Sequence, residues 1–422
     1  MTTTETSSSP VRSALNDNRW LQLIYGIICM AMVSNIQYGW TLFVNPINAK
    51  LGWTLVAIQV AFTILIVAQT WLMPVSGYLI DRFGPRPVVM GSGILVGVSW
   101  SLNSMADSLA VLYFSAALGG LGVGGVVAAC SGNLLKWFPD RRGLAAGLVA
   151  MGFGLGSALF ISPMVDMIKV SGYENAFFNF GMLFGSIIFL VSWFMRSPPA
   201  GSVVEQLGLA VNQRRSYTPL EMVKTLPFWL LYLSFICVAA GGLMVIAQIA
   251  PMAKDMKIAD VPVTMLGLTM SALVFAMMID RVLNGLTRPF FGWISDNIGR
   301  ENTMFIAFSL EALGIWALAI WGHDPLTFVL LTGFVFFAWG EIFSLFPATI
   351  SDTFGPKYTA TNVTLLLTGQ GVAAFIVPLS GVIFRETGSW DLVFLIAAGM
   401  NVIAAVLSLV IKPIRARFIA QH

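Results

Sequence analysis

The segment MPVSGYLIDRFGPR at residues 73–86 and the segment RPFFGWISDNIGR at residues 288–300 share one pattern of small, acidic and basic positions. Each segment lies at or just after the end of an apolar run. Four matched pairs are each 215 residues apart: Pro74/Pro289, Gly77/Gly292, Asp81/Asp296 and Gly84/Gly299. A duplicated unit explains this constant spacing. The pattern therefore predicts a chain made of two halves of the same design.

Both segments lie in an unusually apolar chain. Of its 422 residues, 57% are hydrophobic and 10% are charged, whereas about 25% of a soluble domain is charged. Apolar runs of about 20 residues recur, which is the length that crosses a bilayer as a helix. The composition excludes a soluble globular enzyme and makes the lipid bilayer the expected surroundings. Twelve runs are predicted to span the membrane: 20–43, 55–80, 87–106, 109–135, 143–165, 176–195, 227–251, 263–291, 302–322, 325–350, 360–384 and 390–411.

The longest polar interruption separates the first six runs from the last six. The predicted fold class is therefore an all-α membrane protein with twelve transmembrane helices in two six-helix bundles. The predicted parts, in chain order, are a cytoplasmic N-terminal tail at 1–19, an N-terminal bundle at 20–196, a cytoplasmic linker at 197–226, a C-terminal bundle at 227–412 and a cytoplasmic C-terminal tail at 413–422.

The basic residues indicate the orientation of these helices. Sixteen of the 23 Lys and Arg residues lie in the two tails and in the loops on the same side. Five lie in the opposite loops: Lys50, Lys169, Lys254, Lys257 and Arg385. Because cytoplasmic loops carry the excess of Lys and Arg, both termini are predicted to be cytoplasmic, in a cell inner membrane. The basic residues form no single basic face, so no nucleic-acid partner is expected.

The repeated loops are predicted to form a gate. A glycine at the end of a helix permits close approach of another helix, and an aspartate can cap a helix end or pair across the two bundles. A charged loop that only enforces topology is the alternative, but two copies at matched positions favour the gate. The predicted gating residues are Gly77, Asp81, Arg82, Arg86, Gly292, Asp296 and Arg300.

Span eight carries the residues predicted to bind an anion. A charged side chain inside the membrane costs about 2.5–3.5 kcal/mol, so such groups usually face a polar cavity, a ligand or a partner. Arg281, Asn284 and Arg288 are spaced i, i+3, i+7 and share one helical stripe. A guanidinium matches a carboxylate with two parallel hydrogen bonds. We predict that Arg288 holds the anion with Asn284 beside it; the alternative is that Arg288 pairs with Asp296.

Two acidic residues of the spans have open roles. Asp280 precedes Arg281 and could neutralise its charge. Arg281 would then belong to an outer gate or contribute to the positive electrostatic potential of the cavity, and would not contact the ligand. Glu341 in span ten could carry a proton if burial raises its pKa, or could be the structural partner of a buried arginine. Both acids are therefore candidates for proton coupling.

Span one supplies polar and aromatic residues at membrane depth. Gln37 lies one turn before Thr41, and Tyr38 can donate a hydrogen bond to an anion while its ring excludes water. Gln37 and Tyr38 are therefore predicted to contact substrate. No catalytic residue, metal site or cofactor is expected, and Cys29, Cys130 and Cys237 are interpreted as small apolar residues.

Five further motifs complete a family resemblance. With twelve spans and the two repeated loops, the chain resembles the major facilitator superfamily, and more narrowly its oxalate/formate antiporter family, which is related to the monocarboxylate transporters. The motifs are QYGWTLFVNP at 37–46, KWFPDRRGLAAG at 136–147, YTPLEMVKTLPFW at 217–229, NGLTRPFFGWISDNIGR at 284–300 and WGEIFSLFPATISDTFG at 339–355.

The resemblance implies a pocket between the halves that is exposed alternately to each side. It places the family's eighth-span arginine on Arg288 and a pocket aromatic on Trp339. It also places a family lysine of span eleven on Gln370, which cannot offset the second charge of a dicarboxylate. A site with Arg288 alone suits a monoanion, whereas a contribution from Arg281 would keep oxalate open.

The expected function is secondary active transport of small organic carboxylates by oxalate/formate-type anion exchange, in a protein that functions as a monomer. The alternative is a proton-coupled symporter of monocarboxylates such as lactate, pyruvate or formate, with Glu341 or Asp280 taking the proton. A remote alternative is a non-transporting receptor on the same fold. An enzyme is not expected, because no nucleophile, base and orienting group occur at workable spacing.

Overall fold

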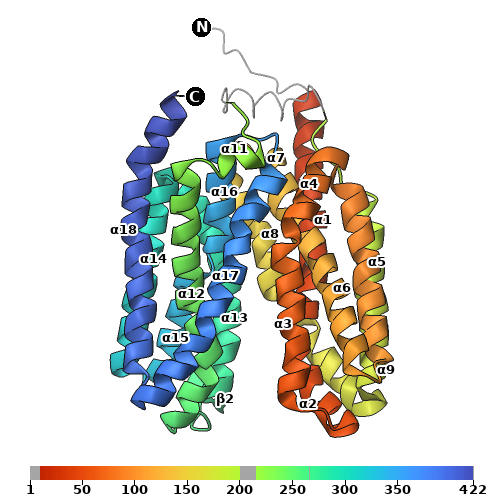
Figure 1. The fold of residues 1–422 in the computed structure, drawn as a ribbon, viewed down its shortest axis with the longest axis vertical. Coiled ribbons are helices and arrows are strands. Elements are labelled where there is room, and N and C mark those ends of the chain that lie inside the picture. Colours follow the sequence, from red (N-terminus) through yellow and green to blue (C-terminus); the bar gives the residue numbers. More distant parts are fainter. Residues whose placement is uncertain (1–9, 200–214, 266, 422) are drawn as a thin grey trace.

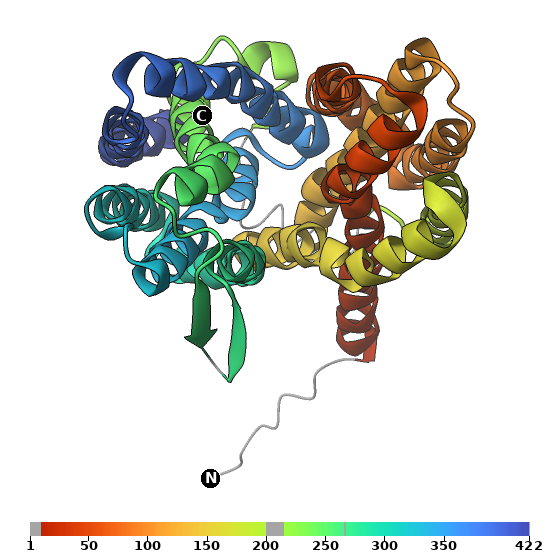
Figure 2. The ribbon, with the colours of Figure 1, turned by 90° about the horizontal axis from the view of Figure 1, so that it is seen from below.

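The computed structural model describes residues 10–199, 215–265 and 267–421, which form two helical bundles side by side (Figures 1 and 2). The N-terminal bundle consists of α1 (Pro10–Tyr38), α2 (Trp40–Leu51), α3 (Leu55–Trp71), α4 (Met73–Phe83), α5 (Pro85–Ser104), α6 (Leu109–Ala128), the π-helix η1 (Ala129–Asn133), α7 (Leu134–Trp137), α8 (Arg142–Gly156), the 3-10 turn η2 (Ser157–Leu159) and α9 (Ile161–Ser192). The C-terminal bundle consists of α12 (Leu226–Asp255), α13 (Ala272–Ile298), α14 (Arg300–Trp321), α15 (Pro325–Trp339), α16 (Ile342–Phe354), α17 (Thr359–Thr387) and α18 (Asp391–Gln421).

The helices confirm the all-α membrane fold with twelve spans. Within the described ranges, nine helical stretches are long and apolar enough to cross a membrane. One of them, Arg142–Ser192, has 51 residues, about twice the length that a bilayer needs. It is divided at Gly172, whose φ of 85° is a conformation that glycine adopts at no steric cost. This division makes ten spans of the nine stretches, and the helices α5 and α13 bring the number to twelve.

Several spans are interrupted helices. Gly39 separates α1 from α2, Leu72 separates α3 from α4 just before Pro74, and Gly340 with Glu341 separates α15 from α16. The π-helix η1 interrupts the fourth span. Because π-bulges and prolines disturb the regular hydrogen-bond ladder, these are the positions where a span bends.

The predicted start of span eight is wrong. Instead of a helix from residue 263, the chain forms an antiparallel hairpin of β1 (Pro262–Met265) and β2 (Leu268–Ser271), and α13 begins at Ala272. The β-branched residues of PVTM and the glycine at position 267, with φ of 78°, suit a hairpin. The hairpin lies at the end of the molecule opposite the C-terminus (Figure 1) and projects beyond the helices when the molecule is seen from below (Figure 2).

The described end of the linker is attached to the C-terminal bundle. Tyr217 donates its backbone N–H to the carbonyl of Phe354, and Asn362 donates to the carbonyl of Tyr217. The short helix α11 (Pro219–Met222) starts with a capping box between Thr218 and Glu221. The hydrogen bonds from Thr218 hold the pKa of the Glu221 carboxyl below its usual value. Residues 200–214 of the predicted linker lie outside the described residues.

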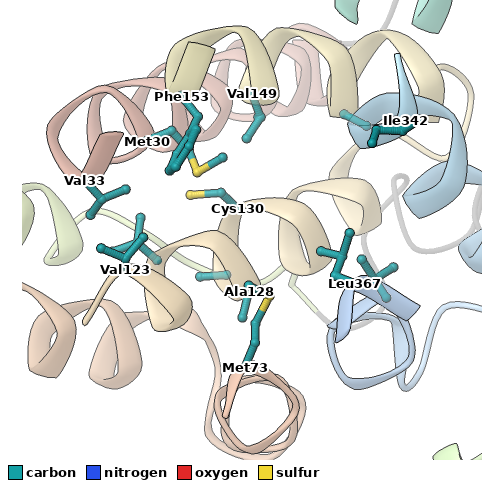
Figure 3. Packing of buried hydrophobic residues seen from close by; sticks show 14 of the residues in the cluster. Met30, Val33, Met73, Val123, Ala128, Cys130, Val149, Phe153, Ile342 and Leu367 are labelled. Atoms are coloured by element: carbon teal, nitrogen blue, oxygen red, sulfur yellow. The ribbon is translucent and has the colours of Figure 1, made fainter. Parts of the chain in front are cut away.

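The apolar core crosses from one bundle into the other. Figure 3 shows Cys130 surrounded by residues of the N-terminal bundle such as Met30, with Ile342 and Leu367 of the C-terminal bundle close by. All three cysteines are buried and free. Large apolar side chains such as Trp293 and Trp316 remain exposed on the outside of the bundles, which is the surface that lipid would cover.

Candidate functional site

The helix α13 holds Arg288 at the junction of the two bundles. The Arg288 side chain is 2% exposed. One terminal nitrogen donates to the carbonyl of Ala150 on α8 at 2.7 Å, and the other donates to Oδ1 of Asn284, one turn earlier, at 2.8 Å. A single guanidinium therefore joins the N-terminal bundle to an amide of its own helix. The alternative pairing of Arg288 with Asp296 is wrong, because Asp296 pairs with Arg300 instead.

Close packing of α8 against α13 makes room for this arrangement. A Cβ at Gly147 would overlap the backbone of Arg288, and one at Gly154 would lie 3.6 Å from the guanidinium carbon. The guanidinium also lies over the ring of Phe343 on α16, 4.9 Å from its centroid. Its Nε has no hydrogen-bond partner among the described residues. A buried cation with a spare donor is suited to an anion.

Arg281 lies two turns before Arg288, about 10 Å away along the helix. It is exposed, and its guanidinium lies 4.6 Å from the ring centroid of Tyr38 on α1. The Tyr38 side chain also interacts with the Arg288 guanidinium. Tyr38 thus connects both arginines of α13 to the opposite bundle. Gln37 beside it is half-buried, and its Oε1 has no partner in the described part of the chain.

Two other predicted site residues, Trp339 and Gln370, lie on α15 and α17. Trp339 packs edge-on against Phe343, but its indole N–H donates to the carbonyl of Val238 at 3.2 Å, so this donor is occupied by the fold. Gln370 is half-buried on α17. The structure therefore brings Arg288, Asn284 and Tyr38 together directly, with Trp339 behind Phe343.

The two predicted acids are buried without full hydrogen bonding. Asp280 is 3% exposed; within the described ranges it forms no ion pair with Arg281, and its Oδ1 has no partner. Glu341 lies at the break between α15 and α16 and is fully buried, and neither carboxyl oxygen has a hydrogen-bond partner there. It is nevertheless close enough to Arg288 for the two charges to interact.

The sequence reasoning missed Glu311 in span nine. This residue of α14 is fully buried, and the amide of Asn401 on α18 donates to its Oε1 at 3.0 Å. It also interacts electrostatically with Glu341. The signal was present, because Glu311 is the one acid inside the apolar stretch FIAFSLEALGIW at 305–316.

The first repeated loop caps a helix of the opposite bundle. Asp81, at the end of α4, accepts hydrogen bonds from the backbone N–H and hydroxyl of Thr361, both at 2.8 Å, and from the N–H of Ala360 at 3.4 Å. These groups belong to the first turn of α17, whose own N-cap residue provides no side-chain cap. Lys136 pairs with Asp81 at 2.8 Å.

The second repeated loop does the same in the reverse direction. Asp296 accepts from the N–H groups of Gly143 and Leu144, each at 2.9 Å, in the first turn of α8. That helix also lacks a side-chain cap from its own N-cap residue. Since helix N-termini carry unpaired donors and partial positive charge, an aspartate there is favourable. Each bundle thus caps one helix of the other.

The basic members of the two loops differ. Arg300 pairs with Asp296 at 2.6 Å and with Asp352 at 2.9 Å, and Asp352 pairs in turn with Arg142 of the N-terminal bundle at 2.5 Å. Arg82 instead donates to the hydroxyl of Tyr78 on its own helix, and Arg86 lies over the ring of Trp193. The two basic residues of the first loop therefore contact their own bundle.

The glycines of both loops lie where the bundles touch. A Cβ at Gly77 would collide with the backbone of α17, and a Cβ at Gly292 would overlap that of Gly143. We name the cluster of Gly77, Asp81, Gly292, Asp296, Arg300, Asp352 and Arg142 the latch. It lies at the end of the molecule that carries the start of α1 and the end of α18, where the two bundles come together (Figure 1).

Comparisons with known proteins cover most of the chain and agree on the family. A family model described as Major Facilitator Superfamily matches residues 23–286 and 261–420. An oxalate:formate antiporter of Oxalobacter formigenes is 34% identical over 403 residues, 95% of this chain and 93% of that protein. Human monocarboxylate transporter 11 is 25% identical, over 79% of this chain and 70% of that protein. The solved structure of a proton:xylose symporter superposes with a TM-score of 0.69 at 13% identity, covering 93% of this chain and 95% of that one.

Proposed function

The chain belongs to the Major Facilitator Superfamily, and from this premise we propose that it exchanges small organic carboxylates across a membrane by alternating access. The substrate class follows from the 34% identical oxalate:formate antiporter and from the monocarboxylate transporter relative. The driving force is the gradient of the exchanged anions. Oxalate and formate are the first pair to test.

The observation that carries this proposal is the placement of Arg288. Its buried guanidinium bridges the two bundles, contacts Asn284 and keeps one N–H donor unpaired among the described residues. A carboxylate that binds this guanidinium would contact both bundles at once, which is what a substrate needs if its binding is to favour rearrangement of one bundle against the other. Asn284, Tyr38 and Gln37 would line the same site, with Trp339 behind them.

Arg281 is the proposed second cation of the site. It is exposed and two turns from Arg288, and it lies on the ring of Tyr38. Gln370 supplies no charge. A dicarboxylate would therefore need Arg281 as its second contact, whereas a monocarboxylate would need Arg288 alone. We propose that Arg281 guides and holds the second carboxylate.

The latch is the proposed gate, and its side of the membrane follows from the basic loops. We place both termini and the latch in the cytoplasm of the cell, with the protein in the inner membrane and active as a monomer. The proposed boundaries remain 1–19, 20–196, 197–226, 227–412 and 413–422. The latch is engaged in this arrangement, and we propose on that basis that the cytoplasmic side is the closed side.

Proton-coupled uptake of a monocarboxylate is the second candidate function. It is favoured by Glu341, a fully buried carboxyl near Arg288 whose oxygens have no hydrogen-bond partners among the described residues. Asp280 is the other acid for this role. In this mechanism the proton would neutralise an acid as the anion occupies the arginine.

The test is transport in proteoliposomes. Vesicles loaded with unlabelled oxalate or formate receive labelled oxalate outside, and parallel vesicles receive labelled lactate with or without an inward proton gradient. Exchange predicts oxalate entry that requires internal anion. Lactate entry that requires the proton gradient, with no oxalate entry, would replace exchange by the second candidate.

A further inference from the structure

Glu311 and Asn401 form a polar pair inside the C-terminal bundle that the proposed transport does not use. Both side chains are fully buried, and they join α14 to α18. The Asn401 amide donates from Nδ2 to Oε1 of Glu311 at 3.0 Å. The remaining acceptors of the two side chains, Glu311 Oε2 and Asn401 Oδ1, are both without a hydrogen-bond partner in the described part of the chain.

One proton would satisfy both unpaired oxygens. An ionised carboxylate offers only acceptors, so Glu311 Oε2 and Asn401 Oδ1 cannot bond to each other. A protonated carboxyl has one O–H donor, and the Asn401 amide has the matching acceptor beside the donor that it already uses. The acid and the amide then form two complementary hydrogen bonds. Because an unsatisfied buried polar atom costs about 1–3 kcal/mol, the neutral acid is the favoured form.

The charges around the pair lead to the same assignment. Glu341, at the junction of α15 and α16, is the charged or titratable group that acts on Glu311. Glu341 in turn interacts with Arg288 on α13, which itself interacts with Tyr38 and Arg281. The helix α12 contributes Gly241 beside the Asn401 amide. Arg288 can neutralise one carboxylate, and Glu341 is the acid that it acts on. In the described part of the chain no lysine or arginine pairs with Glu311, so a negative charge on it would be uncompensated.

We propose that Glu311 is a proton-binding site, occupied at neutral pH as the neutral acid hydrogen-bonded to Asn401. The buried pair then carries no charge. This inference concerns the charge state of the bundle and holds whichever carboxylate is transported.

Infrared spectroscopy of the purified full-length protein at neutral pH tests the assignment. A protonated carboxyl has a C=O band distinct from the carboxylate bands, and exchange into D2O shifts it. The expected result is a component of this band in the wild type that is lost in Glu311→Gln and retained in Glu341→Gln and in the matched buried-acid control Asp280→Asn. Asn401→Leu should move the band, because the carboxyl loses its hydrogen-bond partner.

Two results would overturn the proposal. The first is a wild-type spectrum without the band. The second is a band of unchanged intensity in Glu311→Gln, whether or not intensity is lost in one of the other two variants.

Thermal unfolding supplies an independent readout. Glutamine at 311 reproduces the neutral acid, since its amide can both donate to and accept from Asn401, so Glu311→Gln should melt with the wild type. Asn401→Leu should melt at a lower temperature because it leaves the buried Glu311 carboxyl without its hydrogen-bond partner. Equal destabilisation by the two substitutions would contradict the assignment.

Discussion

The two bundles close against each other in the same way but differ in what they bury. Each sends one aspartate, Asp81 or Asp296, to the first turn of a helix in the other. Along the membrane-spanning part of the described chain, however, the buried titratable side chains Asp280, Arg288, Glu311 and Glu341 all belong to the C-terminal bundle. The N-terminal bundle faces them with Tyr38, the carbonyl of Ala150 and glycines.

This difference separates the tasks of closing and binding. In the proposed function the repeated loops form a symmetric gate, whereas the side chains proposed to recognise the substrate are concentrated in the C-terminal bundle. The N-terminal bundle packs against them with a surface that carries no buried charge at this depth in the described residues. Substitutions in the two bundles should therefore differ more in their effects on binding than in their effects on closure.

The largest expected effect is at Arg288. Arg288→Ala should lower exchange at least about 100-fold, since it removes charge-assisted hydrogen bonds worth about 1.5–3 kcal/mol each. Labelled-anion exchange in proteoliposomes measures it. Arg288→Lys is the matched control, because it keeps the positive charge and loses the planar pair of donors of the guanidinium. Its activity should lie between those of the wild type and Arg288→Ala. Unchanged exchange in a well-folded Arg288→Ala protein would show that Arg288 does not bind the anion, and would contradict the placement of the binding residues in the C-terminal bundle.

The second effect compares the two halves of the latch. Asp296→Ala should shift the closed arrangement toward separated bundles about tenfold or more, given about 1.5–3 kcal/mol for each charge-assisted hydrogen bond. Asp81→Ala should do so less, because Asp81 lacks a counterpart of the network through Arg300. Distances between spin labels at the exposed positions Arg141 and Lys357 would report the shift.

The latch comparison has a clear failing outcome. The native cysteines are buried, so labelling can be confined to the two introduced sites. Equal distance distributions in Asp81→Ala and Asp296→Ala would show that the network around Arg300 contributes nothing to closure. No change in either variant would show that the latch is not the gate.

The third effect concerns charge within the C-terminal bundle. Gln370→Lys should raise the preference for oxalate over a monocarboxylate by about tenfold, the equivalent of 1.4 kcal/mol, because it adds a second cation. Competition of unlabelled anions against labelled oxalate gives the ratio. An unchanged ratio would show that position 370 does not face the ligand. Gln370→Met, of similar size and without charge, is the control.

The smallest effect tests the N-terminal face. Tyr38→Phe should reduce anion affinity about fivefold, the loss expected for a hydrogen bond worth about 1 kcal/mol. The ring on which Arg281 lies is retained in this variant. A loss as large as that of Arg288→Ala would contradict the unequal division between the bundles. Substrate-induced thermal stabilisation measures the affinity without transport.

The fold was predictable because its signals are long and repeated. Runs of about 20 apolar residues and two loops at one spacing predicted the twelve helices. The hairpin at Pro262–Ser271 was missed because its apolar residues continue the hydrophobic run, and hydrophobicity alone does not separate a strand from a helix start. Arg288, Asn284 and Tyr38 were found by type and spacing, and their roles stay predictions.

Other parts of the site depend on contacts between distant segments. The role proposed for Glu311 depends on its hydrogen bond with Asn401, 90 residues later, and on its interaction with Glu341. The sequence placed Arg82 and Arg86 in the gate together with Arg300, yet only Arg300 belongs to the network across the bundles. Matched positions in the repeat therefore predict the contacts of the aspartates well, because the helices that they cap are repeated too. They predict the contacts of the arginines less well, because the neighbours of the arginines differ between the halves.

The reciprocal capping has a consequence for ancestry. Asp81 binds a helix of the other bundle, and Asp296 binds the corresponding helix of the first, which is the contact pattern of an isologous interface with a two-fold axis. Two identical six-helix subunits could have closed in this way before their genes were joined. After fusion, both copies would have kept the aspartates that cap the opposite bundle. The rest of each copy could then diverge, so that the C-terminal bundle acquired buried titratable side chains and the N-terminal bundle an uncharged surface that packs against them.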